Sequence, residues 1–234
     1  MGLAIRTTTD CGQPLSELLV DGMGKETGQF TEFQMDALRE IGNVGAGNAA
    51  TALSQMVGRR VDMSVTKVMI LPAEAIAKFL GGIEKNVAAV HMPLYGEMLG
   101  IALIFFPLER LPELSAMLIG QKEEDPANLS ELGQSAIKEL GSILTGAYLS
   151  ALFRFIHIQL IHGVPGLVID MAQAILDTVL VELEQREEVA IVIETEFLED
   201  DKQLTGSFFL LPEAGSLKKF FEAFSKALGI PSDG

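Results

Sequence analysis

The 234-residue sequence is poor in cysteine, tryptophan, histidine and basic residues. Its single cysteine, Cys11, cannot form an internal disulfide, and such usage is typical of proteins from a reducing compartment. Only 17 lysines and arginines stand against 32 aspartates and glutamates, which gives a net charge of −15. Because a chain this acidic repels the phosphates of nucleic acids and of anionic membranes, we expect neither as a partner.

The sequence also lacks a hydrophobic run long enough to cross a membrane as a helix. Its most apolar stretch, residues 87–107, is interrupted by His91, Pro93, Gly96 and Glu97. The first residues carry no apolar segment of signal-peptide length behind a basic start. We therefore expect a cytoplasmic protein.

What is present is a globular composition, with 48% hydrophobic and 21% charged residues. Residues 1–28 show little periodicity, and we expect a tail there with one short helix over residues 15–20. The rest, residues 29–228, is expected to form a single domain made of two repeats, 29–120 and 127–228.

The two repeats share one predicted order of elements. The first is expected to contain a helix over residues 31–58, strands over 61–71, 86–94 and 99–106, a short helix over 72–80, a hairpin turn at 95–97 and a connecting helix over 107–119. The second is expected to contain a helix capped by Asn128 or Ser130 and ending near 153, a strand over 155–162, a helix over 167–183, strands over 188–197 and 203–211, and a last helix from 212 to 229.

Identical letters also recur at a fixed offset of 99 positions, as in Glu40 and Glu139 or Gly42 and Gly141. Chance matches would not keep both this register and the order of elements, so we infer an internal duplication. The predicted fold is α+β: two pseudo-symmetric halves, each a helix followed by hairpins, that form an antiparallel or mixed sheet packed with helices.

The first helix of each repeat carries a polar stripe. Asp36, Glu40 and Asn43 fall within an arc of about 60° on a helix. A Glu-x-x-Asn pair on a helix is usually solvated surface, and glycines inside a helix usually mark tight packing. The stripe nevertheless recurs in the second repeat as Glu139 and Ser142, and duplication of exposed polar residues favours a function.

The stretch EIGNVGAGNAATAL, its counterpart ELGSILTGAYLSAL and the layout in two halves resemble the CheC phosphatases of bacterial and archaeal chemotaxis, whose relatives are CheX and FliY. The pattern of that family is Asp or Ser, three residues, Glu, two residues, Asn, then 22 residues and Pro. The first half matches at Asp36, Glu40 and Asn43 but has Thr66 at the last position.

The second half departs from the pattern at a different position. It has Ser135, Glu139 and Pro165, but Ser142 stands where the family has Asn. The resemblance covers residues 30–228.

The resemblance implies an enzyme that hydrolyses the aspartyl phosphate of the response regulator CheY. It implies that Asn43 orients the attacking water and that Glu40 docks the receiver domain, with Asp36 and Ser135 as further partner-binding residues. The receiver supplies the Mg²⁺, so no cofactor of this chain's own is expected. Glu139 keeps the docking role, and the shorter Ser142 predicts a weaker second site.

The resemblance also implies a second partner, the deamidase CheD. In CheC proteins the helix equivalent to residues 166–182 docks CheD, and Asp170 is the expected contact. An amphipathic helix packed on the sheet explains most of that segment equally well.

Other functions remain open. The chain could be a non-catalytic binding module for CheD or CheY-phosphate, or a FliY-like flagellar-switch component, although we expect no switch domain after the second half. Residues 45–50, GAGNAA, match a dinucleotide-binding pattern that requires a preceding strand, where a helix is predicted. His157 and His162 are expected on opposite faces of a strand, which disfavours a metal site.

Overall fold

The computed structural model describes residues 31–122, 125–183, 189–199, 202–213 and 215–229. The predicted N-terminal tail, its short helix and Cys11 lie outside the described residues. No helix among the described residues is both long enough and apolar enough to cross a membrane.

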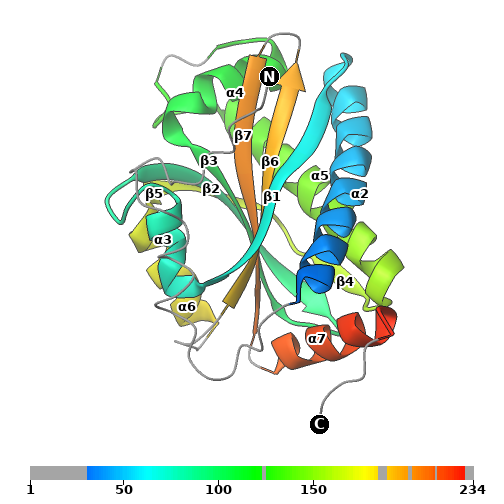
Figure 1. Cartoon of the computed structure of the whole chain (residues 1–234). Coiled ribbons are helices and arrows are strands. Elements are labelled where there is room, and N and C mark those ends of the chain that lie inside the picture. The colour runs from blue at the N-terminus through cyan, green and yellow to red at the C-terminus, as the bar shows by residue number, and fades with distance from the viewer. Residues whose placement is uncertain (1–30, 123–124, 184–188, 200–201, 214, 230–234) are drawn as a thin grey trace, which may run out of the picture.

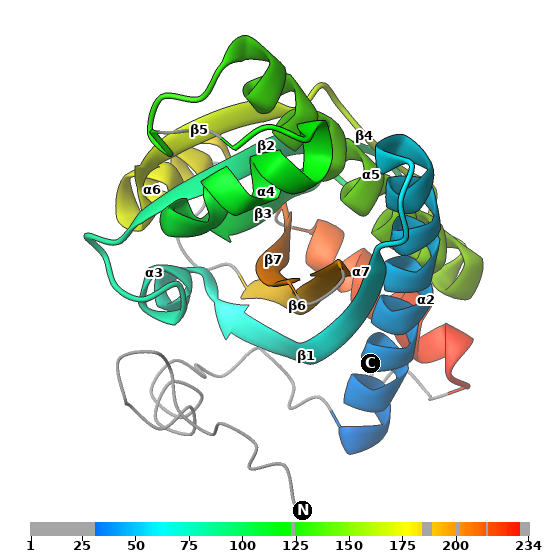
Figure 2. The same cartoon turned by 90° about the horizontal axis from the view of Figure 1, so that it is seen from above.

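A seven-stranded antiparallel sheet forms the middle of the molecule. It is strongly twisted and curls along its length (Figures 1 and 2). The order of strands is β1-β6-β7-β3-β2-β4, and β5 continues beside β2. The strands are β1 (Asp62–Pro72), β2 (Asn86–Gly96), β3 (Gly100–Pro107), β4 (Leu160–His162), β5 (Gly166–Met171), β6 (Val189–Glu199) and β7 (Lys202–Pro212).

Helices cover both faces of the sheet, so the predicted α+β class is confirmed (Figure 1). One face carries α2 (Glu32–Val57), α4 (Leu111–Ile119), α5 (Glu131–Ile156) and α7 (Ser216–Ala227), which enclose the larger core. The other face carries α3 (Ile76–Phe79) and α6 (Ala172–Glu182), which enclose a smaller core. The two 3₁₀ turns are η1 (Ala73–Ala75) and η2 (Leu108–Arg110).

The strand order reads the same from both edges when β1, β2 and β3 are exchanged with β4/β5, β6 and β7. The register is symmetric as well. Pro72 pairs with Val189 at one edge, and Met171, 99 positions after Pro72, pairs with Asn86 at the other. The two halves of the sheet therefore share one strand order and one register.

Helices α2 and α5 are equivalent in length and in the residues that end them. Each has 26 residues and begins after a hydroxyl N-cap, Thr31 or Ser130, whose side chain accepts a backbone N–H of the first turn. Each ends at a left-handed C-cap, Gly58 or His157. His157 adopts φ 57° without being glycine, an unusual conformation that any side chain finds less favourable.

Two predicted boundaries in the second half are wrong. The segment 155–162 is not a strand, because α5 continues to Ile156 and β4 contains only residues 160–162. Residues 167–171 are not helical, because residues 166–171 form β5, which pairs with β2; the helix starts only at Ala172. Pairing with a neighbouring strand overrides the helical periodicity of this short apolar run.

Candidate functional site

The predicted stripe of the first repeat lies on the outer surface of α2. Leu38 and Ile41 are buried in the larger core, whereas Asp36, Glu40 and Asn43 are exposed. The segment is helical because a capping box between Thr31 and Gln34 starts it and apolar residues at helical spacing bury its inner face. This geometry points the Glu-x-x-Asn pair away from the core.

The three residues of this stripe differ in their partners. The Asp36 carboxylate accepts a hydrogen bond from Arg39 and forms an ion pair with it at 3.0 Å. Within the described part of the chain, the side chains of Glu40 and Asn43 form no hydrogen bond or ion pair. The Glu40 carboxylate and the Asn43 amide, one turn apart, are therefore available to bind another molecule. The charge of Asp36 is partly neutralised by Arg39.

The second stripe lies on α5 and is less open. Ser135 and Glu139 are exposed, but Ser142 is only half-exposed. A serine side chain is also about one bond shorter than an asparagine side chain and has no amide. The second pair therefore reaches less far into solvent than the first.

The two helices pack side by side and run antiparallel (Figures 1 and 2). Within their contact, Gly45 lies against the ring and backbone of Tyr148. Asn43 lies two residues before Gly45, and Ser142 lies six residues before Tyr148. At a rise of 1.5 Å per residue the two pairs are displaced by about 12 Å along the helices, so they lie apart on the surface.

The glycines of α2 serve different purposes. A side chain at Gly45 would overlap with Tyr148, so the close approach that its position in a helix suggested is real there. Gly47 faces open space, and no residue of the described part of the chain lies where its side chain would be. Tyr148 was not singled out from the sequence, and the only signal for it was a glycine inside a predicted helix.

The last position of the family pattern lies in the sheet. Thr66 sits at a bulge in β1, where its hydroxyl donates to the backbone oxygen of Glu194 at 3.3 Å. At the equivalent position, Pro165 separates β4 from β5, because proline has no N–H for a strand ladder. The strand therefore continues through Thr66 in one half and is interrupted at Pro165 in the other.

The expectation that Asp170 lies on a helix is wrong. Asp170 lies on β5, opposite Val87 of β2, and its carboxylate accepts the N–H of Met171 at 2.7 Å. The side chain is exposed, two residues before α6 begins. Any contact through this residue would involve the edge of the sheet together with the start of the helix.

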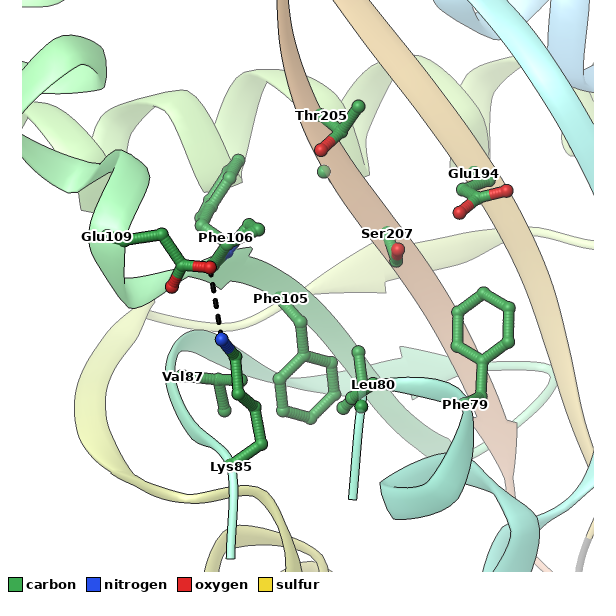
Figure 3. Close-up of a pocket in the computed structure, with 13 residues that line it drawn as sticks. Phe79, Leu80, Lys85, Val87, Phe105, Phe106, Glu109, Glu194, Thr205 and Ser207 are labelled. Atoms are coloured by element: carbon green, nitrogen blue, oxygen red, sulfur yellow. Dashed lines mark hydrogen bonds and ion pairs between the residues drawn. The ribbon is translucent and has the colours of Figure 1, made fainter. Parts of the chain in front are cut away.

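A pocket of about 250 Å³ lies elsewhere, beside α3 and the smaller core (Figure 3). Phe79 and Phe105 form part of its wall, and Lys85 forms an ion pair with Glu109 at 3.0 Å on one side. Partial burial opposes ionisation of Glu109, but hydrogen bonds to its own backbone and to Lys85, with the nearby positive charges, lower its pKa overall. None of the residues predicted for function lines this pocket.

The remaining sequence signals also receive positions. The GAGNAA segment lies inside α2. A dinucleotide site needs a strand before this segment, and a helix precedes it here. His157 caps α5 and His162 lies on β4, so the two do not share a strand. Among the described residues, no group of three or more histidine, cysteine and acidic residues is arranged to hold a metal ion.

The fold, an antiparallel sheet with two equivalent helices on one face, is similar to that of proteins of known structure. The crystal structure of Thermotoga maritima FliY superposes with a TM-score of 0.66 at 20% identity, covering 86% of this chain and 100% of that one. The sequence model of the CheC-like family matches residues 33–69, which contain Asp36, Glu40, Asn43 and Thr66.

Two sequence relatives extend the comparison. The chain is 36% identical over 201 residues to the CheY-P phosphatase CheC of Bacillus subtilis (strain 168), covering 84% of this chain and 96% of the relative. It is 27% identical over 124 residues to the flagellar motor switch phosphatase FliY of the same organism, covering 52% of this chain and 32% of that protein. The chain belongs to the CheC-like family.

Proposed function

We propose that this chain is a phosphatase that hydrolyses the aspartyl phosphate of a CheY-type receiver domain in chemotaxis. The observation that carries the proposal is the exposed pair Glu40 and Asn43 on α2, which has no hydrogen-bond or ion-pair partner among the described residues and lies inside the segment that matches the family. The similarity over most of its length to a protein named CheY-P phosphatase supports the same reaction here.

In this reaction the oxygen of a water molecule forms a bond to phosphorus, and the bond between phosphorus and the aspartyl oxygen breaks. The carboxylate leaves, and the protons of the water pass to the phosphate and the solvent. A Mg²⁺ ion bound by the receiver would neutralise charge on the phosphoryl group. The amide of Asn43 accepts and donates hydrogen bonds, so it holds the water in line without acting as a titrating base.

Glu40 has a docking role in this proposal. It lies three residues before Asn43, one helical turn away, and its carboxylate projects from the same surface. A lysine of the receiver can form a charge-assisted hydrogen bond with it and so fix the distance between Asn43 and the phosphoryl group. Asp36 extends the acidic surface, although Arg39 reduces its net charge. Ser135 is at the equivalent position of the second helix.

The second pair, Glu139 and Ser142, is proposed as the weaker site. Glu139 is exposed and can dock a receiver in the same way. Ser142 offers a shorter, half-exposed hydroxyl, so a water held there is further from the in-line position.

Regulation by CheD and a cytoplasmic location belong to the same proposal. The support for a CheD contact is the family membership and the exposure of Asp170 where β5 meets α6. The competing function is a non-catalytic module that binds CheY-phosphate or CheD. Release of inorganic phosphate from phosphorylated CheY, measured with a small amount of this chain, separates the two. An enzyme releases many phosphates per chain, whereas a binding module releases none.

Asn43→Ala tests the proposal, with Asn48→Ala as its matched control. Both residues are exposed on α2, but Asn48 points about 140° away from Asn43 around the helix. We expect Asn43→Ala to lower phosphatase activity by about ten- to a hundredfold, as loss of a positioning group does, and Asn48→Ala to leave it unchanged. Equal activity of the wild type and Asn43→Ala, with the same melting temperature, would show that this amide does not orient the water.

A further inference from the structure

The first turns of α2 and α5 expose large apolar side chains at equivalent positions. Phe33 is 59% exposed and Leu132, 99 positions later, is 58% exposed. A single exposed apolar residue is ordinary on a protein surface. Two at the same place in both helices, each at the start of the stripe described above, indicate a shared purpose.

On α2 this residue aligns with the docking glutamate. Phe33, Glu40 and Val44 lie within about 20° of one direction around the helix axis. Val44 is 42% exposed, so the Glu40 carboxylate stands between two exposed apolar side chains along one line.

The second stripe has a smaller set of these groups. Leu132 is exposed like Phe33, but Ile143, the counterpart of Val44, packs against the larger core.

We propose that Phe33 and Val44 form an apolar docking surface on either side of Glu40 for the phosphorylated receiver domain, with Phe33 as its main contact. The inference rests on the proposed function. The occupant is a receiver for two reasons. The surface flanks the Glu40 carboxylate, which has no partner among the described residues and can pair with a cation of another protein. It also lies one turn from Asn43, where the phosphoryl group would be. Apolar groups around a desolvated charge pair exclude water and strengthen it.

In this proposal Phe33 and Asn43 have different kinetic roles. Phe33 contacts the partner without reaching the phosphoryl group, so its loss weakens binding and leaves the chemical step intact. Asn43 acts on the water, so its loss lowers kcat.

Phe33→Ala tests the inference, with Phe33→Leu as the conservative variant and Ile83→Ala as the control. Ile83 is 60% exposed but precedes β2, away from both stripes. We expect Phe33→Ala to raise KM for phosphorylated CheY about tenfold with kcat within about twofold, as loss of one interface anchor does. Phe33→Leu should recover most of the affinity, Leu132→Ala should change KM by less than about threefold, and Ile83→Ala should match the wild type.

A second measurement separates this inference from the proposed function. Binding of CheY carrying beryllofluoride, a phosphoryl mimic, is measured for the same variants. Weaker binding by Phe33→Ala in a chain that releases no phosphate would support the docking surface and refute the phosphatase. Turnover by the wild type with unchanged KM and binding in Phe33→Ala would refute the docking surface alone, as would an equal loss in Ile83→Ala.

Discussion

The ring of Tyr148 on α5 lies against Gly45 on α2, where any side chain larger than hydrogen would overlap with it. The Tyr148 hydroxyl is held on the other side by Thr195 of β6, at 2.6 Å in the buried interior. Tyr148 therefore contacts the sheet through its hydroxyl and α2 through its ring. Because Asn43 lies two residues from Gly45, this contact also sets where the proposed water-orienting amide stands.

The first prediction concerns the two glycines of α2. Gly45→Ala should lower the free energy of unfolding by about 1–2 kcal/mol, because overpacking against Tyr148 outweighs the gain in helix propensity of about 1 kcal/mol. Gly47→Ala should raise it by up to about 1 kcal/mol, because its side chain would meet none of the residues that the structure describes. Urea unfolding of both variants measures the difference.

The sign of that difference is decisive. If Gly45→Ala were as stable as Gly47→Ala, Tyr148 would move aside without cost. The ring would then not determine how closely the two helices approach.

The second prediction is a dependence of stability on alkaline pH. Burial raises the pKa of Tyr148 to about 12, with the hydrogen bond to Thr195 opposing the shift. The unfolded phenol ionises first, near its ordinary pKa of about 10, so the stabilisation is complete below pH 10 and is lost as the pH rises toward 12.

Tyr148→Phe removes the ionising group and isolates this effect. The variant should be less stable than the wild type at pH 8 by about 1–3 kcal/mol, because the Thr195 hydroxyl loses its buried partner. Between pH 10 and 12 its free energy of unfolding should fall less steeply, by about 1.4 kcal/mol per pH unit. Parallel curves for the two proteins in urea titrations would contradict the assignment.

The third prediction concerns the unequal second site. Ser142→Asn restores the residue of the family pattern and should raise phosphate release, because an amide reaches about one bond further than the hydroxyl of Ser142. The measurement is best made in an Asn43→Ala background, where the first site is silent. No gain there would mean that docking of the receiver on α5, and not reach, limits the second site.

Much of the fold follows from local sequence. The caps Thr31 and Ser130 and the apolar spacing between them and Gly58 or His157 place α2 and α5 within a few residues. The structure of the segment after α5 does not follow from local sequence. Residues 166–171 have the apolar character of a helix start and become a strand only by pairing with β2. His157 as a left-handed C-cap could not be foreseen either, since that position usually holds glycine.

The site shows the same division. Helical spacing alone places Glu40 and Asn43 on one exposed surface, and the structure agrees. The ion pair of Asp36 with Arg39 and the partial burial of Ser142 depend on rotamers and on neighbouring elements, which the spacing does not determine. The surroundings of Lys67 are also tertiary: burial lowers its pKa, and Glu194 of the adjacent strand partly offsets this.

The most direct test of the account compares the two sites by decay of phosphorylated CheY. Glu40→Ala/Asn43→Ala removes the exposed pair of α2, and Glu139→Ala/Ser142→Ala removes the pair of α5. We predict that the first double variant loses most of the activity and that the second retains most of it. A larger loss from the second double variant than from the first would contradict the ranking of the sites, and full activity of both would contradict the assignment of catalysis to these helices.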